Sequence, residues 1–579
     1  MGLVLLVAAA LAVAQPSTRP STAPADDGLR ARALQAIDAG DLDGLREAAE
    51  AQLNTILPDL GKLKAEQVVR LCAYRELALY FGKAGQLGPG DRDTLKWLIS
   101  RPRLFPTLMM AVSADDPPEK VLGVLSKLRA DQGERLDEYP DLTAAFCVVW
   151  DTQTIGTSAD RHNDVDRAVR LFRYFINARD RMVFRPDDLP WPLAVFLVDV
   201  QVTDEEIVWT LNKYKAHRSI GGVYFDVPYD EAAYYEGKSK VISGHKYTLE
   251  NLNRHGGVCI DQAYYASQVG KILGIPTAVA TGQGGGGGVG HAWLGFLHVV
   301  GRVVLWDFEE GRYDEHLYWV GNVRDPQTGK RITDADVALL AELQRSGPAD
   351  RLFSVALWKL RDLVGDSQRA DLLRKAIDLS PGNREAWLSL ADMGAQRKLS
   401  PQQMNQVVAI LQKFAVRRYG DFAFEICRRM VAGQEPAEQL AAMERATGIF
   451  WDRPDLLARI RLEQAQLLLA LDRRDDAMRA YGDVLTNRLD AGPIILQAMD
   501  KVDGLLRESK ELPRLAAIYD QVWKRMPTPD ESAFVTGTPW YLVGQKYARL
   551  LDELGESVAA DGVRERLRIM NTATGARGR

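Results

Sequence analysis

The chain has 579 residues, of which 46% are hydrophobic and 26% are charged, with 73 Lys and Arg against 78 Asp and Glu. These ordinary fractions exclude a disordered or collagen-like polymer, and the near balance of charge argues against a protein dedicated to binding nucleic acid. Domains usually run to about 100–200 residues, so the chain is long enough for about three. Four cysteines are too few for a disulfide framework in this length.

The N-terminal residues are typical of an export signal. Residues 3–13 are almost all apolar, the run is too short to span a bilayer, and Ala12 and Ala14 suit a signal-peptidase site. No Lys or Arg precedes the run, so an uncleaved structural N-terminus stays open as the alternative. We predict a signal peptide at 1–14 and a flexible linker at 15–27. The protein is then exported, to the periplasm or the extracellular space, without a membrane span.

The next part of the chain has a helical pattern. From residue 29 to about 203, apolar residues recur at helical spacing, with breaks at Gly88-Pro89-Gly90 and Asp116-Pro117-Pro118. This predicts an N-terminal helical domain at 28–205. Cys72 and Cys147 lie within these apolar faces and are expected to be core residues. An export compartment permits a bridge between them, which the sequence leaves open.

Glycine becomes frequent between residues 224 and 318, and the pattern changes. One helix is predicted at 259–273, followed by β-type runs at 277–281, 292–299 and 303–308. We therefore predict a central α+β domain at 206–335.

From residue 350 the helical pattern returns as paired segments. Small residues that let antiparallel helices approach recur twelve apart, at Ala465 and Ala477 and again at Ala548 and Ala560. These residues resemble degenerate tetratricopeptide repeats and predict a repeat-like α-solenoid at 350–570. An irregular helical domain is the alternative, and Cys427 is expected to be a core residue in either case.

The central domain contains the residues that indicate chemistry. In His255-Gly256-Gly257-Val258-Cys259, two glycines allow a tight turn, and Cys259 begins the predicted helix. Unpaired N–H groups and the helix dipole at that end favour the thiolate and can bind an oxyanion. His255, four residues earlier, either tunes this thiolate or is a solvated turn residue.

A thiolate nucleophile needs a proton-transfer partner and a group that orients it. His291 opens one predicted strand and Asp307 ends the next. A three-residue hairpin loop at 299–301 would pair Trp293 with Asp307 and place the carboxylate within diagonal reach of His291. A register slip of one residue would send Asp307 to the opposite face.

The sequence around these residues resembles that of the transglutaminase-like superfamily. The similarity lies in Gly257-Val258-Cys259 with Ala263, Gly274-Ile275-Pro276, His291-Ala292-Trp293 and Trp306-Asp307. It implies a papain-like thiol core in which Cys259 is the nucleophile, His291 the general base and acid, and Asp307 the orienting acid. Members of this superfamily cross-link glutamine to lysine, hydrolyse peptides or amides, remove glycans, or have lost activity.

Two features depart from the family pattern. The family usually supplies an oxyanion donor from a side chain before the cysteine, for which Tyr224 or Tyr229 is a candidate here. Asp307 is followed by Phe308-Glu309-Glu310, where a proline is common. The glycine-rich segment 282–288 leads into a strand and lacks the Lys-Ser/Thr of a phosphate-binding loop, so it is either a flexible loop or a lid.

The sequence thus predicts an exported thiol enzyme that acts on peptide or amide bonds of a polypeptide substrate. The catalytic residues are Cys259, His291 and Asp307, and the substrate-cleft candidates are Trp293, Gly257 and Trp306. The scattered histidines and the absence of metal-ligand motifs predict no metal, and no cofactor is expected. The alternative is a catalytically silent scaffold whose C-terminal repeats bind a partner protein. The choice between hydrolysis and transamidation and the oligomeric state stay open.

Overall fold

The computed structural model describes residues 28–575 apart from 84–86, 153–163, 283–289, 314–319, 415–418, 452, 490–491 and 530–534. The predicted signal peptide 1–14, the linker 15–27 and nearly all of the glycine-rich segment 282–288 lie outside the described residues. The described part is mainly helical, with helices α1–α26 and strands β1–β5.

The N-terminal part consists of helices that begin where prolines fit. The predicted breaks at 88–90 and 116–118 directly precede or include the starts of two helices at Pro89 and Pro118, because proline is tolerated in the first turn but not farther in. The helices are α1 (Leu29–Ala39), α2 (Asp43–Ile56), α3 (Ala65–Phe81), α4 (Pro89–Ile99), α5 (Leu104–Ala111), α6 (Pro118–Gln132), α7 (Pro140–Val149), α8 (Val165–Ala178), α9 (Trp191–Val198) and α10 (Asp204–Tyr214).

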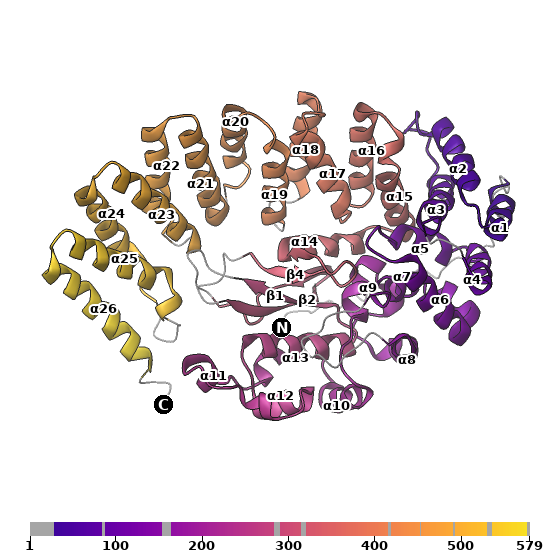
Figure 1. Ribbon diagram of the computed structural model, residues 1–579, viewed down its shortest axis with the longest axis horizontal. Helices are drawn as coiled ribbons and strands as arrows, with labels where there is room; N and C mark the ends of the chain where they lie inside the picture. The colour runs from indigo at the N-terminus through magenta and orange to yellow at the C-terminus, as the bar shows by residue number, and fades with distance from the viewer. Residues whose placement is uncertain are drawn as a thin grey trace, which may run out of the picture.

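The central part is a five-stranded antiparallel sheet in the order β3-β2-β1-β4-β5. Its elements are α11 (Glu231–Tyr235), α12 (Leu249–His255), α13 (Cys259–Ile272), β1 (Thr277–Gly282), β2 (His291–Val300), β3 (Val303–Asp307), β4 (Asn322–Arg324), β5 (Arg331–Thr333) and α14 (Asp334–Leu339). Helix α13 packs on β1 and β2, and α14 lies on the other side against β3, β4 and β5 (Figure 1). The predicted helix and three strands are confirmed. The three-residue strands β4 and β5 were not predicted.

The predicted register between β2 and β3 is wrong by three residues. Asp307 pairs with Phe296, and Val300 pairs with Val303, so the turn is the two-residue loop Gly301-Arg302. The β-branched Val299 and Val300 extend the strand, and Gly301, at φ 63°, takes the left-handed conformation that two-residue hairpins favour.

The C-terminal part is an array of paired helices that arches over the sheet (Figure 1). Odd-numbered helices contact one another in succession and form the inner row, and even-numbered helices form the outer row. Ala465 and Ala477 are fully buried where α21 meets α22, as are Ala548 and Ala560 between α25 and α26. The helices are α15 (Pro348–Lys359), α16 (Asp366–Leu379), α17 (Arg384–Ala395), α18 (Pro401–Phe414), α19 (Gly420–Val431), α20 (Pro436–Thr447), α21 (Pro454–Ala470), α22 (Arg474–Asn487), α23 (Pro493–Glu508), α24 (Leu512–Arg525), α25 (Pro539–Glu553) and α26 (Ser557–Gly575).

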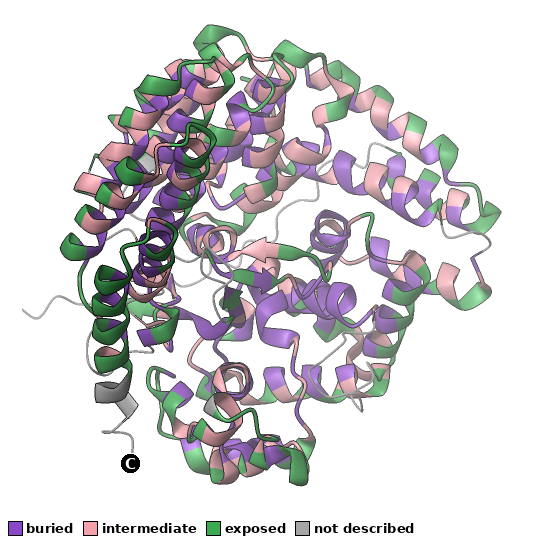
Figure 2. Cartoon of the chain, turned by 60° about the vertical axis from the view of Figure 1, so that its left-hand side comes forward, coloured by how far each residue is buried: buried purple, intermediate pink, exposed green. Residues whose placement is uncertain are grey.

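The three parts share their apolar interior. One cluster of buried residues runs from Leu29 to Ile460 and a second from Leu440 to Leu567. Buried residues accordingly concentrate in the middle of the molecule, and exposed ones on the outer helices (Figure 2). The predicted boundaries after residues 205 and 335 each fall inside a helix, α10 and α14. No helix among the described residues has both the length and the apolarity needed to cross a bilayer.

Candidate active site

The turn before Cys259 is fixed by backbone contacts. Gly256 has φ 82°, and a Cβ there would lie 2.5 Å from the Pro228 carbonyl oxygen, so the close approach requires glycine. The Gly257 N–H donates to that same carbonyl at 3.0 Å, and the Gly257 carbonyl accepts from Asp230 N–H at 2.8 Å. Gly257, a predicted cleft residue, is buried and serves to attach the turn to the segment beside it.

A buried carboxylate holds the start of α13. Asp261 accepts from the Lys240 ammonium at 2.9 Å on both oxygens, from the Tyr247 hydroxyl at 2.9 Å and from Val258 N–H at 2.9 Å. Its side chain is only 2% exposed. A carboxylate this deeply buried is stable only when paired, and Lys240 supplies the compensating charge.

Cys259 is the first residue of α13, as predicted, and its thiol reaches the start of β2. Burial raises the pKa of the Cys259 thiol, while the backbone N–H groups of Ala292 and Ile260 oppose this rise by stabilising the thiolate. The helix N-terminus therefore offsets the cost of burial only in part. The resting form near neutral pH is the thiol, contrary to the expectation of a favoured thiolate.

His291 begins β2, directly before Ala292, so it lies at the end of the sheet that Cys259 reaches. Its Nε2 is 2.7 Å from the Gly311 carbonyl oxygen. A carbonyl can only accept, so Nε2 carries the proton and Nδ1 presents a lone pair. Burial lowers the pKa of His291, which keeps the ring neutral, and Tyr313 stacks on the ring at 4.9 Å and 27°.

Asp307 is not the residue that orients this imidazole. Cross-strand partners point to the same face, so the Asp307 side chain lies on the face of Phe296, and His291, five residues from Phe296, lies on the other face. The Asp307 carboxylate instead accepts from Glu309 N–H at 2.9 Å within its own turn. The three-residue register shift is the physical reason, because an odd shift exchanges the two faces.

The two tryptophans predicted to line a substrate cleft are core residues. Trp293 is fully buried, with the Arg312 guanidinium 5.1 Å from its ring centroid. Trp306 is 8% exposed and packs against Phe196 of α9 and against Phe308. Both rings are therefore packed within the protein core.

Of the two tyrosines considered as oxyanion donors, Tyr224 has its proton engaged elsewhere. Its hydroxyl donates to the Ala292 carbonyl at 2.9 Å, and the side chain is buried beside Cys259. The backbone N–H groups of Cys259 and Ile260, at the start of α13, face the sulfur. His255 is the last residue of α12 and stacks on His245 with ring centroids 3.8 Å apart.

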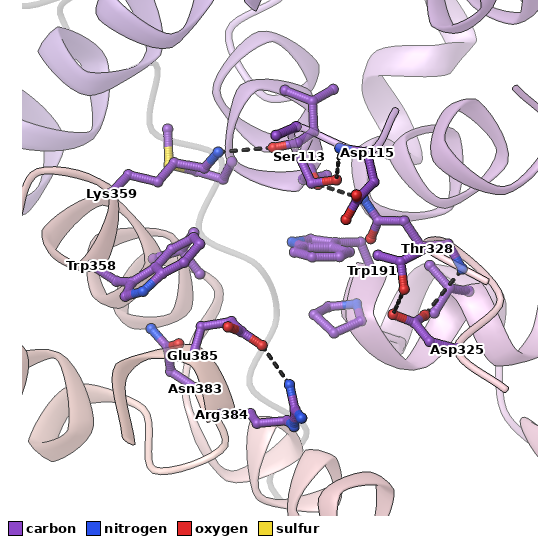
Figure 3. Close-up of a pocket in the computed structure, with 18 of the residues that line it drawn as sticks. Ser113, Asp115, Trp191, Asp325, Thr328, Trp358, Lys359, Asn383, Arg384 and Glu385 are labelled. Atoms are coloured by element: carbon purple, nitrogen blue, oxygen red, sulfur yellow. Dashed lines mark hydrogen bonds and ion pairs between the residues drawn. The ribbon is translucent and has the colours of Figure 1, made fainter. Parts of the chain in front are cut away.

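A separate cavity of about 730 Å³ lies where the N-terminal helices, the β4–β5 turn and the array meet. Trp191 and Trp358 lie on opposite sides of it (Figure 3), and the Trp358 indole N–H donates to Ser389 at 3.0 Å. None of its lining residues comes from α13 or β2. No sequence motif marks this cavity, since its walls come from segments far apart in the chain.

Comparisons with known proteins identify no relative of this chain. No protein-family model, no curated protein and no solved structure matches it. Within the described residues, no group of three or more His, Cys, Asp or Glu side chains is arranged to hold a metal ion.

Proposed function

We propose that the protein is a thiol-dependent acyl-transfer enzyme of the transglutaminase-like kind, which attacks a peptide or amide bond with Cys259 and moves protons with His291. The tautomer of His291 carries the proposal. Because Nε2 donates to the Gly311 carbonyl, Nδ1 is the ring nitrogen that can accept a proton, and the proposal assigns it the proton of the Cys259 thiol. Cys259 approaches the same end of β2, where the Ala292 N–H faces its sulfur.

The pKa directions specify how the thiol is activated. Burial raises the pKa of Cys259 and lowers that of His291, so the thiol and the imidazole are both neutral before substrate binds. The thiol proton then passes to Nδ1 as the sulfur attacks the substrate carbonyl carbon. The N–H groups of Cys259 and Ile260 stabilise the oxyanion, and the imidazolium returns the proton to the departing amine.

The resulting thioester is resolved by water or by an amine. The incoming nucleophile gives its proton to His291 as it attacks, and His291 gives that proton to the departing Cys259 sulfur. The array favours a polypeptide as the substrate, because its inner row of tetratricopeptide-like helices faces the sheet (Figure 1). Extended helical arrays offer concave surfaces suited to polypeptides.

Acetylation by p-nitrophenyl acetate tests the chemistry without a known substrate. We expect an acetyl thioester on Cys259, identified by peptide mapping, that is absent in Cys259→Ala and slowed in His291→Ala but unchanged in Cys427→Ala. The rate should persist to a pH below the ordinary histidine value of 6.5, because burial keeps His291 neutral. Equal acetylation with and without His291 contradicts the proposal.

A non-catalytic scaffold that binds a partner protein on its C-terminal helices is the second candidate. The array favours it, because its odd-numbered helices follow one another along the concave side (Figure 1). The cavity of about 730 Å³ between Trp191 and Trp358 has the volume of a small-molecule site and lies apart from the thiol. Folded protein whose Cys259 resists acetylation at every pH would support this function over the first.

A further inference from the structure

The imidazole of His291 is held by one short segment, Gly311-Arg312-Tyr313. The Gly311 carbonyl accepts from Nε2 at 2.7 Å, and the Tyr313 ring stacks on the imidazole at 4.9 Å. Gly311 has φ 76°, and a Cβ there would lie 2.6 Å from the Tyr224 ring. Only glycine lets the carbonyl turn toward His291 at this position.

The residue between these two contacts is itself anchored. The Arg312 guanidinium lies 5.1 Å from the ring centroid of Trp293 and 3.7 Å from an oxygen of Asp334. Both charged side chains are about nine-tenths buried, at 10% and 11% exposure. Arginine suits such a place because its flat cation stacks on an aromatic ring while it pairs with a carboxylate.

Asp334 is in turn fixed by the backbone. It is the first residue of α14, and its two oxygens accept from Gly321 N–H and Ala335 N–H, each at 2.9 Å. Burial raises the pKa of Asp334 to about 6, and Arg312 opposes that rise. At neutral pH the pair is therefore ionised, and it ties the segment that holds His291 to α14.

We propose that Arg312 and Asp334 are positioning residues that take the place of the orienting acid of a Cys-His-Asp triad. They act indirectly, by holding the Gly311 carbonyl within hydrogen-bond distance of Nε2 and the Tyr313 ring against the imidazole. Neither side chain touches the reacting atoms. The proposal deepens the proposed function and rests on it for its catalytic consequence, whereas the control of the imidazole by Arg312 can be measured without catalysis.

The difference from a triad carboxylate is chemical. A carboxylate would stabilise the imidazolium by its full charge, whereas a backbone carbonyl fixes the tautomer and direction of the ring with only a dipole. The arrangement thus favours a neutral base of fixed orientation. It also makes the identity of residue 307 unimportant for the imidazole.

Removing one carboxylate at a time distinguishes the two acids. In the acetylation assay, we expect Asp307→Asn to stay within about twofold of the unchanged protein. Asp334→Asn and Arg312→Ala should slow acetylation of Cys259 by about tenfold or more, because a base displaced by about 1 Å loses its geometry. Arg312→Lys should recover part of the rate. The double variant should be no slower than Arg312→Ala, since the two side chains act as one unit.

The buried cysteines report whether a variant has merely unfolded. Cys72 and Cys147 are fully buried, so they become labelled only if the structure opens. A variant with slow acetylation of Cys259 and protected Cys72 and Cys147 has lost positioning and not its fold. If all four cysteines of Asp334→Asn are labelled, that variant has unfolded. Arg312→Lys and Arg312→Ala then test the positioning proposal.

A direct measurement of the imidazole separates this proposal from the proposed function. Nitrogen-15 NMR of histidine-labelled protein, with His291 assigned through His291→Gln, reports which ring nitrogen carries the proton. We expect the Nε2–H tautomer in the unchanged protein and in Asp307→Asn, and a mixture of tautomers in Arg312→Ala. If Arg312→Ala keeps the single tautomer, the positioning proposal is overturned. If the tautomer depends on Arg312 but Cys259 is never acetylated, the positioning proposal stands and the catalytic one fails.

Discussion

The helical array and the central domain bury cysteines in different surroundings. Cys427 lies within α19, where burial alone raises the pKa of its thiol to about 12. Burial also raises the pKa of Cys259, but backbone N–H groups from Ala292 and Ile260 oppose it. Inside a helix every N–H is already bonded to the chain, whereas the start of α13 and the start of β2, which lies beyond the end of β3, leave N–H donors for the sulfur. Backbone N–H groups that can stabilise a thiolate are therefore found where a helix or a strand begins.

The largest test of this contrast is the reactivity of the cysteines in the native protein. We expect iodoacetamide to modify Cys259 faster than Cys427, because backbone N–H groups oppose the rise in the pKa of Cys259 whereas burial alone acts on Cys427. The Cys259 rate should still rise above about pH 8.5, because its pKa is raised and not lowered. Peptide mapping across pH measures both. Equal rates for the two thiols would remove the contrast.

The turn before Cys259 should tolerate replacement of its glycine far less than an exposed turn does. Gly256→Ala should lower the free energy of unfolding by about 3 kcal/mol, from the left-handed conformation and the overlap with the Pro228 carbonyl. Gly301→Ala is the matched control, because Gly301 also has a positive φ but its Cβ would meet open space. That variant should lose about 1 kcal/mol. Urea unfolding that gives the same loss for both would show that the close approach is unimportant.

Neighbouring lysines test the buried charge beneath the thiol. Lys240→Met leaves Asp261 buried without its cation and should cost about 2 kcal/mol, less than a fully buried pair because Lys240 is one-third exposed. The thiol pKa should also rise further, since Asp261 already raises it. Lys238→Met removes only an exposed pair with Glu236 and should change neither quantity.

The smallest effect is expected on the outside of the array. Arg514 of α24 pairs with Glu511, the residue directly before that helix, and both side chains are exposed. Arg514→Ala should therefore change the unfolding free energy by less than about 0.5 kcal/mol. Ala477→Leu, which adds bulk where α21 meets α22, should cost about 1–3 kcal/mol. A larger loss from the arginine than from the alanine would mean that the array is held by surface charge.

Most elements of the fold could be predicted because their signals are local. The helix that starts at Cys259 follows from the glycines before it, and the strands from their β-branched runs. The register could not be predicted, because Val299 and Val300 suit either a turn flank or a strand, and a three-residue difference decides which face Asp307 occupies.

The orienting group of His291 is hidden from the sequence for another reason. Every residue has a backbone carbonyl, so the amino-acid sequence does not mark Gly311 as the acceptor of the Nε2 proton. Arg312 and Asp334 lie 22 residues apart and act only through that carbonyl. The thiol and the imidazole belong to particular residue types, which a sequence motif can reveal. The carbonyl that orients the imidazole is common to all residues and forms no such motif.

The contact between the N-terminal helices and the array has a consequence for synthesis. The Cys72 thiol of α3 lies 3.8 Å from the carbonyl oxygen of Ala356 in α15, across 284 residues of chain. At about 5–20 residues per second, a ribosome needs roughly 15–60 s to make the intervening chain. For that time the apolar side of α3 lacks its partner. A nascent chain stalled before α15 should therefore bind chaperones, and release them once α15 has emerged.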